Sequence, residues 1–193
     1  MMVAIIKYNA GNATSVYNAV IRLGYDAVIT DDVGVLTKAD KVIFPGVGAA
    51  SSAMAYLKET GLAEVIKNLK QPTLGICLGQ QLMCAFSEEG NVSCLGIFPI
   101  QVKLFPPTEI VPHMGWNTIF NLKTPLFEGV EDQSDCYYVH SYYCEDSEYT
   151  IAKTNYIVEY SAALQKDNFY ATQFHPEKSA EIGSRILRNF LSL

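Results

Sequence analysis

The sequence predicts an α/β protein: a flavodoxin-like, mostly parallel sheet with helices on both faces and antiparallel strands added in the C-terminal half. In the first half of the chain, short apolar runs alternate with segments of helical periodicity. Strands that alternate with helices in this way form parallel βαβ units whose sheet is covered on both faces. In the second half, strand-like segments follow one another at close spacing, which favours antiparallel hairpins added to that sheet.

The first half supplies strands and helices in turn. Val3–Ile6 is predicted as a buried strand, and a helix follows whose apolar face ends near Gly24, a residue suited to close it in the left-handed conformation. Helical segments between residues 49 and 69 break at Gly61. Further strands are predicted over residues 27–29, 42–44 and 73–76.

The second half is predicted to be mostly strand until the last helix. Residues 100–104 alternate between apolar and polar side chains, as in a half-exposed strand. The other strand-like segments cover residues 118–120, 137–140, 149–152, 157–164 and 169–174. The chain closes with a helix that presents Ile182, Ile186, Leu187, Phe190 and Leu191 on one face.

The composition indicates one folded, acidic domain over residues 1–193. Hydrophobic residues make up 49% of the 193 residues, enough for a sizeable core, and no repeat or linker interrupts the chain. The net charge of -6 disfavours binding to nucleic acid and to an anionic membrane surface. No apolar run approaches the roughly 18 residues of a membrane-spanning helix. The N-terminal apolar segment is too short for a signal-peptide core and has no basic region before it.

The cysteines indicate a reducing compartment. There are five, an odd number, and none has Cys-x-x-Cys spacing: Cys77, Cys84, Cys94, Cys136 and Cys144. A disulfide framework and a zinc site are therefore disfavoured, and we expect a cytoplasmic protein without a metal or cofactor.

The segment Gly75-Ile76-Cys77-Leu78-Gly79 has the form of a nucleophile elbow, in which a sharp turn joins a strand to a helix. Glycines flank the nucleophile because side chains there would clash with the turn. A cysteine at a helix N-terminus also gains thiolate character. The alternative is a core cysteine with two glycines nearby by chance.

Two further segments complete a possible catalytic set. His175 and Glu177 follow a predicted strand with Pro176 between them, so the histidine can serve as the base of a thiol nucleophile and the glutamate can orient it. Pro45–Gly48 follows the strand at 42–44, and loops at the carboxyl ends of parallel strands share one edge of the sheet. Such a glycine-rich loop can direct N–H groups at an oxyanion, although it could also be a plain turn.

These three segments together resemble the motifs of triad-type (class I) glutamine amidotransferases. Two more, Pro112–Asn117 and Val139–Tyr142, resemble in particular the glutaminase subunits of imidazole glycerol phosphate synthases, which act in histidine biosynthesis. The resemblance covers the whole chain. It departs at Lys7–Asn12, where the family often has Asp-Tyr-Gly-x-Gly-Asn.

The resemblance implies a role for each site residue. Cys77 would attack the side-chain amide of glutamine, with His175 moving the proton and Glu177 orienting His175. The backbone N–H groups of Val47 and Leu78 would form the oxyanion hole. Glutamine would be bound by Gly48, Gln81, Glu89, Ser141 and Tyr142, although Gln81 could instead be a solvated helix position and Glu89 part of an exposed turn.

The resemblance also implies a partner, a (β/α)8-barrel cyclase that receives the ammonia. The interface positions would be Asn12, Trp116, Tyr137 and Lys178. His113 and His140 would lie at the interface or support the active site, with ordinary packing as the alternative. The tyrosines at 137, 138, 142 and 143 fit either a protein–protein surface or one face of a hairpin.

Two other functions compete with this one. The chain could serve a different synthase, such as one for anthranilate or a purine nucleotide, but Pro112–Asn117 argues against that. It could also be a non-catalytic regulatory subunit, although a chain without activity has no chemical reason to keep Cys77, His175 and Glu177 together.

Overall fold

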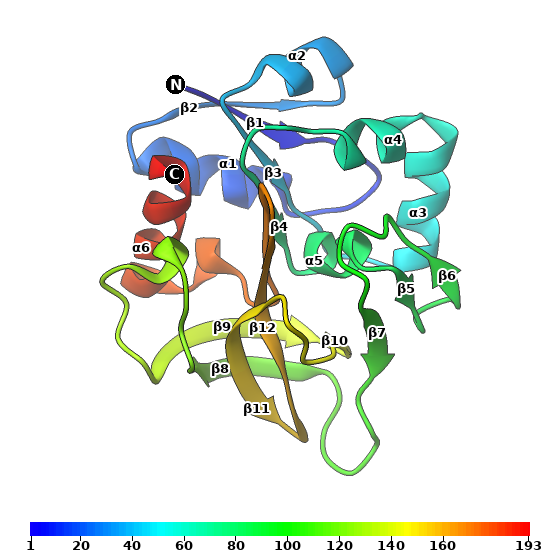
Figure 1. Cartoon of the computed structure of the whole chain (residues 1–193), viewed down its shortest axis with the longest axis vertical. Helices are drawn as coiled ribbons and strands as arrows, with labels where there is room; N and C mark the ends of the chain where they lie inside the picture. The colour runs from blue at the N-terminus through cyan, green and yellow to red at the C-terminus, as the bar shows by residue number, and fades with distance from the viewer.

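A seven-stranded sheet forms the centre of the computed structural model, which describes all residues from 1 to 193 (Figure 1). Its strands are β1 (Met2–Ile6), β2 (Asp26–Thr30), β3 (Lys41–Phe44), β4 (Thr73–Ile76), β11 (Thr150–Tyr156), β12 (Val158–Lys166) and β13 (Phe169–Thr172). The order is β11-β12-β13-β4-β3-β1-β2. The pairs from β2 to β13 are parallel, whereas β12 is antiparallel to both of its neighbours. The predicted fold class is confirmed, since β2-β1-β3-β4-β13 has the flavodoxin-like strand order.

Helices cover both faces of this sheet because its strands are apolar on both sides. Val3 and Ile5 pack in one core with α1 (Ala13–Arg22) and α6 (Ala180–Ser192). Ala4 and Ile6 point the other way, into a second core. That core is formed with α2 (Val33–Lys38), α3 (Ala50–Glu59), α4 (Leu62–Lys67) and α5 (Leu78–Met83). In Figure 1, α1 and α6 lie on one side of the sheet and α3, α4 and α5 on the other.

The local signals for helix ends are confirmed, and one helix was not predicted. Gly24 and Gly61 have φ of +87° and +77°, the left-handed conformation expected of glycines that end helices. Helix α2 buries only Leu36, so it has no apolar periodicity to reveal it. Its start is marked instead by Asp32, whose side chain accepts a hydrogen bond from the Val35 N–H.

The expectation that the late strands are added to the main sheet is right for β11, β12 and β13, whereas the strands predicted near residues 100–104, 118–120 and 137–140 lie outside that sheet. Strands β8 (His113–Ile119) and β9 (Ser134–His140) form a separate hairpin. A four-stranded sheet contains β10 (Tyr142–Cys144), β7 (Gln101–Leu104), β5 (Phe86–Ser87) and β6 (Val92–Ser93) in that order. Alternate residues of β9, including Cys136 and Tyr138, are buried in the α1–α6 core, so the hairpin packs across a face of the sheet (Figure 1). Two short 3-10 helices, η1 (Pro125–Phe127) and η2 (Pro176–Lys178), complete the structure.

All five cysteines are free, and four of them are buried. None of the helices has the length and hydropathy that crossing a membrane requires.

The terminal helix should contribute strongly to stability. Phe190 is fully buried and its ring contacts Tyr170 of β13 at 6.2 Å between centroids. We expect Phe190→Ala to lower the free energy of unfolding by about 3–5 kcal/mol, since it removes a large core side chain. Arg188→Ala on the exposed face of the same helix is the control and should change it by less than about 0.5 kcal/mol. Urea unfolding measures both, and equal effects would contradict the packing described here.

Candidate active site

Cys77 stands at a strained turn between β4 and α5. Its φ of +54° is unfavourable for any residue with a side chain. The turn forms because its two glycines allow close backbone contacts. A Cβ on Gly79 would lie 1.9 Å from the carbonyl oxygen of Phe44, and one on Gly75 would lie 2.9 Å from Met83 Sδ. The predicted elbow geometry is therefore present, and it depends on these glycines.

Parallel pairing brings the histidine segment to the same place. Strand β13 lies beside β4, and the Cys77 N–H donates to the Thr172 carbonyl at 2.8 Å. Three residues after Thr172, the His175 side chain lies beneath the surface with its Nδ1 2.8 Å from Glu177 Oε1. Both side chains are completely shielded from solvent. The structure thus brings together the three residues predicted as a triad.

The charges around His175 favour its protonated form. Burial alone lowers the pKa of His175, but negative charge on Cys77 and the bond to Glu177 outweigh it and raise the pKa to about 10. His175 Nε2 makes no hydrogen bond of good geometry, so the Cys77 contribution is mainly one of charge. An imidazolium beside a thiolate is the ion pair that activates a cysteine nucleophile.

The structure places Asn12 beside the triad, although the sequence predicted it at a partner interface. Its side-chain amide donates to Glu177 Oε1, and its Nδ2 lies 3.4 Å from His175 Nδ1. Asn12 itself has a left-handed backbone, with φ of +80°, at the start of α1. Asn12 therefore helps to hold the glutamate, and contact with a partner stays a prediction.

The loop after β3 is held from two sides. The Tyr8 hydroxyl donates to the Pro45 carbonyl at 2.7 Å, and the Gly11 N–H donates to the Val47 carbonyl at 3.2 Å. Between these contacts, the Gly46 carbonyl accepts the N–H of Leu78 at 3.3 Å. The N–H and C=O of a trans peptide point in opposite directions, so the Val47 N–H is turned away from Leu78. The two N–H groups predicted for an oxyanion hole do not converge in this conformation.

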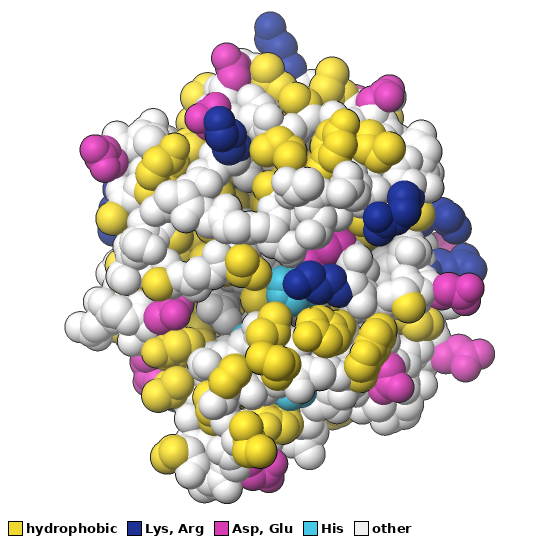
Figure 2. Space-filling model, turned by 180° about the vertical axis from the view of Figure 1, so that it is seen from behind, with side chains coloured by type: hydrophobic (Ala, Val, Ile, Leu, Met, Phe, Trp, Pro, Cys, Tyr) yellow, Lys and Arg dark blue, Asp and Glu magenta, His cyan; other side chains and the backbone are white.

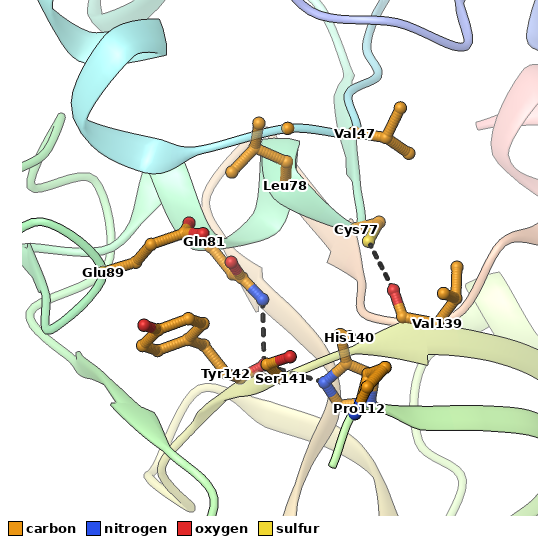
Figure 3. Close-up of a pocket in the computed structure, with 11 residues that line it drawn as sticks. Val47, Cys77, Leu78, Gln81, Glu89, Pro112, Val139, His140, Ser141 and Tyr142 are labelled. Atoms are coloured by element: carbon orange, nitrogen blue, oxygen red, sulfur yellow. Dashed lines mark hydrogen bonds between the residues drawn. The ribbon is translucent and has the colours of Figure 1, made fainter.

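A cavity of about 320 Å³ opens in front of Cys77 (Figure 3). Its wall contains Cys77, both predicted oxyanion residues and all five predicted glutamine-binding residues. The lining residues are Val47, Gly48, Cys77, Leu78, Gln81, Glu89, Pro112, Val139, His140, Ser141 and Tyr142. The structure therefore brings all eight predicted positions to one cavity, and their roles in binding stay predictions.

Gln81 and Glu89 are both tied to the protein around the cavity. Gln81 is buried, and its Nε2 donates to the Tyr142 carbonyl at 2.9 Å and to Gln173 Oε1 at 3.0 Å. Glu89 Oε2 accepts the Ala50 N–H at 2.8 Å, at the start of α3. The solvated-helix alternative for Gln81 is therefore excluded, and the Glu89 carboxylate stabilises a helix end as well as lining the cavity.

Sequence reasoning missed some residues of the site. Pro112 and Val139 line the cavity, and the Val139 carbonyl lies 3.9 Å from Cys77 Sγ. Gln173 Nε2 lies 3.6 Å from the same sulfur. Gln173 could have been found, since it follows β13 at the same sheet edge as Cys77. Pro112 and Val139 belong to two segments that carry the family resemblance, but their position in the cavity wall could not be predicted, because the hairpin that carries Val139 packs across the sheet by long-range contacts.

Three predicted interface residues form an exposed patch. Trp116 is 55% exposed, and its ring lies edge-on to Tyr137 at 5.9 Å. Lys178 Nζ lies 6.0 Å from the centre of the Tyr137 ring, and Met114 beside them is 64% exposed. Tyr138, by contrast, is fully buried, so the four tyrosines do not all face outward. Figure 2 shows one face on which hydrophobic side chains gather below a central basic side chain and a histidine.

The sequence around this site matches a known protein family. The sequence model for "Glutamine amidotransferase class-I" matches residues 5–193. The chain belongs to the class I glutamine amidotransferases. It is an enzyme of that family, and its elbow cysteine and buried histidine lie within the matched region.

Similar proteins extend this comparison. The chain is 63% identical to the imidazole glycerol phosphate synthase subunit HisH of Bacteroides fragilis (strain YCH46), over all of both sequences. It is 47% identical to the subunit of the same name from Haemophilus influenzae (strain Rd), over 98% of this chain and 96% of that protein.

Two solved structures share the amidotransferase fold at low sequence identity. One is a putative GMP synthase subunit from Thermoplasma acidophilum, with a TM-score of 0.77 and 20% identity over 100% of this chain and 92% of that one. The other is PurLQS from Thermotoga maritima, with a TM-score of 0.75 and 16% identity over 99% and 97%. At these identities the likeness establishes the fold alone.

The raised pKa of His175 can be measured directly. We expect its ring to stay protonated through neutral pH and to titrate near pH 10 in nuclear magnetic resonance spectra. In Cys77→Ala the midpoint should fall by about one pH unit or more, because the neighbouring negative charge is gone. Since the folded pKa lies above the usual value of 6.5, this group stabilises the fold below about pH 6.5 and loses that effect as the pH rises toward 10. A midpoint near 6.5 in the unmodified protein would contradict the ion pair.

Proposed function

We propose that the chain is the glutaminase subunit of an imidazole glycerol phosphate synthase. It hydrolyses glutamine to glutamate and ammonia and passes the ammonia to a cyclase subunit. The cyclase then makes imidazole glycerol phosphate and aminoimidazole carboxamide ribonucleotide in histidine biosynthesis. The observation that carries this proposal is Cys77 at the mouth of the cavity with the His175–Glu177 pair behind it. The full-length similarity to HisH proteins supports the choice of pathway.

The proposed reaction begins with attack of the Cys77 thiolate on the side-chain amide carbon of glutamine. The C=O electrons move onto oxygen, and the resulting tetrahedral intermediate collapses as His175 donates its proton to the leaving nitrogen, releasing ammonia. His175 then takes a proton from water, and the hydroxide attacks the thioester. Collapse of this second intermediate releases glutamate and restores the thiolate beside a protonated His175. Glu177 holds His175 through Nδ1 in both steps.

The oxyanion hole is proposed to be the regulated part of the site. The Gly46 carbonyl now occupies the N–H of Leu78. Rotation of the Gly46–Val47 peptide would turn the Gly46 carbonyl away from the Leu78 N–H and direct the Val47 N–H into the space that the carbonyl leaves. Glycine permits such a rotation at low cost. A partner that binds the rotated form more tightly would shift the population toward it. This idea requires slow hydrolysis in the free subunit.

The exposed patch is proposed as the docking surface for the cyclase. Trp116, Tyr137 and Met114 supply aromatic and apolar area, and Lys178 adds a positive charge next to the triad residues. Amphipathic aromatic side chains of this kind are enriched at protein–protein interfaces. We further propose that the partner is a (β/α)8 barrel that channels the ammonia, and that the pair works in the cytoplasm, where its five free thiols stay reduced.

A glutaminase assay with and without candidate synthase partners separates the competing functions. Activity that rises only with the cyclase of imidazole glycerol phosphate synthesis supports the proposal. Activation by an anthranilate or purine-nucleotide synthase instead would point to another pathway. Glutamine binding without hydrolysis under all conditions would indicate a regulatory subunit.

Cys77 should be the site of covalent chemistry. Cys77→Ala should lower kcat by about 10⁴-fold or more, because no other group can form the thioester. The small side chain stands at the cavity surface, so folding and partner binding should be unchanged. A glutamine analogue with an electrophile in place of the amide should label Cys77 alone, as measured by mass spectrometry of peptides. Labelling of Cys84 or Cys94 with Cys77 untouched would overturn the assignment.

Partner binding should complete the oxyanion hole. We expect the glutaminase kcat to rise by about 10²–10³-fold when the cyclase and its nucleotide ligand are added, the effect of one oxyanion-hole donor. Steady-state assays of the free and assembled protein measure this ratio. The extent of Cys77 alkylation by iodoacetamide serves as a control, since that reaction forms no oxyanion. A free subunit that works at full rate would show that the loop does not gate the reaction.

A further inference from the structure

Two buried histidines lie next to the cavity but play no part in the triad. His140 forms part of the cavity wall, and His113 contacts it from the opposite strand of the β8–β9 hairpin. His113 and His140 are 4% and 6% exposed. Their hydrogen-bond partners determine which ring nitrogen of each carries the proton.

The proton position on His113 follows from Asn117. Asn117 Oδ1 accepts the Thr118 N–H at 2.8 Å, and its Nδ2 donates to the Asn155 carbonyl at 3.1 Å, so the amide has one orientation. The same Nδ2 lies 3.3 Å from His113 Nε2, which must therefore accept. In a neutral ring the other nitrogen carries the proton, so His113 is the Nδ1–H tautomer.

His140 is constrained from both ends. Its Nδ1 lies 2.7 Å from the Tyr142 carbonyl, which can only accept, so Nδ1 carries the proton. Its Nε2 is then the acceptor and lies 3.3 Å from His113 Nδ1 and 3.1 Å from the Tyr160 hydroxyl. The hydrogen bonds therefore run in one direction: Asn117 Nδ2 donates to His113 Nε2, His113 Nδ1 donates to His140 Nε2, and His140 Nδ1 donates to the Tyr142 carbonyl.

Both rings stay neutral, as this arrangement requires. Burial lowers the pKa of His113 to about 4. For His140, burial is again the main cause and the charges of His113 and His175 add to it, while the bond to Tyr142 opposes them; its pKa falls to about 3. A proton added to either ring would place two donors face to face.

We propose that Asn117, His113 and His140 form a neutral hydrogen-bond relay that positions the Ser141–Tyr142 backbone for glutamine binding. The proposal rests on the proposed glutaminase function. His140 is a positioning residue in it, because it acts through the Tyr142 carbonyl and not on the reacting atoms.

The relay acts on a carbonyl that also orients Gln81. The Tyr142 oxygen accepts from both His140 Nδ1 and Gln81 Nε2 (Figure 3). Since Gln173 takes the second N–H of Gln81, only the Gln81 Oε1 acceptor is left for a ligand. An acceptor at this wall suits the ammonium or amide N–H groups of glutamine. Loss of the His140 donor would free the Tyr142 peptide to turn and disturb both Ser141 and Gln81.

The first test reads the tautomers in the unmodified chain. Nitrogen-15 spectra of its three histidines distinguish Nδ1–H from Nε2–H rings and both from imidazolium. At neutral pH we expect His113 and His140 to be neutral Nδ1–H rings and His175 to be protonated. An Nε2–H or charged His140 would overturn the relay, whether or not the protein hydrolyses glutamine.

The second test uses matched variants in steady-state glutaminase assays of the protein together with its cyclase. In His140→Asn the side-chain amide can replace the Nδ1 donor, whereas His140→Leu has similar volume and no donor. We expect KM for glutamine to rise about tenfold or more in His140→Leu, with kcat much less affected, and to return toward the original value in His140→Asn.

Tyr138→Phe is the structural control. It removes a buried hydroxyl that bonds Thr154 but keeps the ring that stacks on His113, so it should lower thermal stability without raising KM. Equal KM values in His140→Leu and the unmodified protein would overturn the positioning role, and so would an equal rise in Tyr138→Phe. If the unmodified protein itself does not hydrolyse glutamine, the proposed function fails. The tautomer measurement then still shows whether the hydrogen-bond relay exists.

Discussion

The site depends on the close approach of Gly79 to the carbonyl oxygen of Phe44. Helix α5 can begin directly at the end of β4 only because no side chain separates it from β3. That approach forces Cys77 into a conformation with positive φ and holds its sulfur at the open edge of the sheet. A single methyl group on Gly79 would displace the helix, the turn and the nucleophile together.

The loops from the neighbouring strands are built around that turn. The loop after β1 contacts both sides of the reaction centre: Tyr8 and Gly11 hold the loop after β3, and Asn12 reaches Glu177. The His175 segment is held by β9, since its N–H donates to the Tyr137 carbonyl at 2.9 Å. Movement of either the β1 loop or the hairpin would therefore be transmitted to the catalytic pair. This connects the exposed patch on the hairpin with the chemistry beneath it.

The hairpin also explains how a buried polar cluster can serve a binding site. Polar groups within a core are stabilised only when each donor has an acceptor, and the histidines of β8 and β9 meet this condition together with Tyr160. The cost of leaving any one unpaired makes the arrangement rigid. The cluster therefore keeps the cavity wall formed by Ser141 and Tyr142 rigid. The opposite wall contains the Pro45–Gly48 loop, which can change conformation.

Local sequence alone determined the parallel strands, the helix ends at Gly24 and Gly61, and the elbow at Cys77. Each depends on neighbouring residues: apolar runs, a glycine that permits positive φ, and paired glycines around a nucleophile. The sequence also identified the residues that line the cavity from α5 and the Pro45–Gly48 loop, through their resemblance to a known family. Tertiary structure decided what local patterns do not contain. Asn12 reaches Glu177, the β8–β9 hairpin crosses the sheet, and the Gly46 carbonyl occupies the Leu78 N–H. Each of these results from contacts between residues far apart in the chain, whose positions are set by packing and by the pairing of buried polar groups.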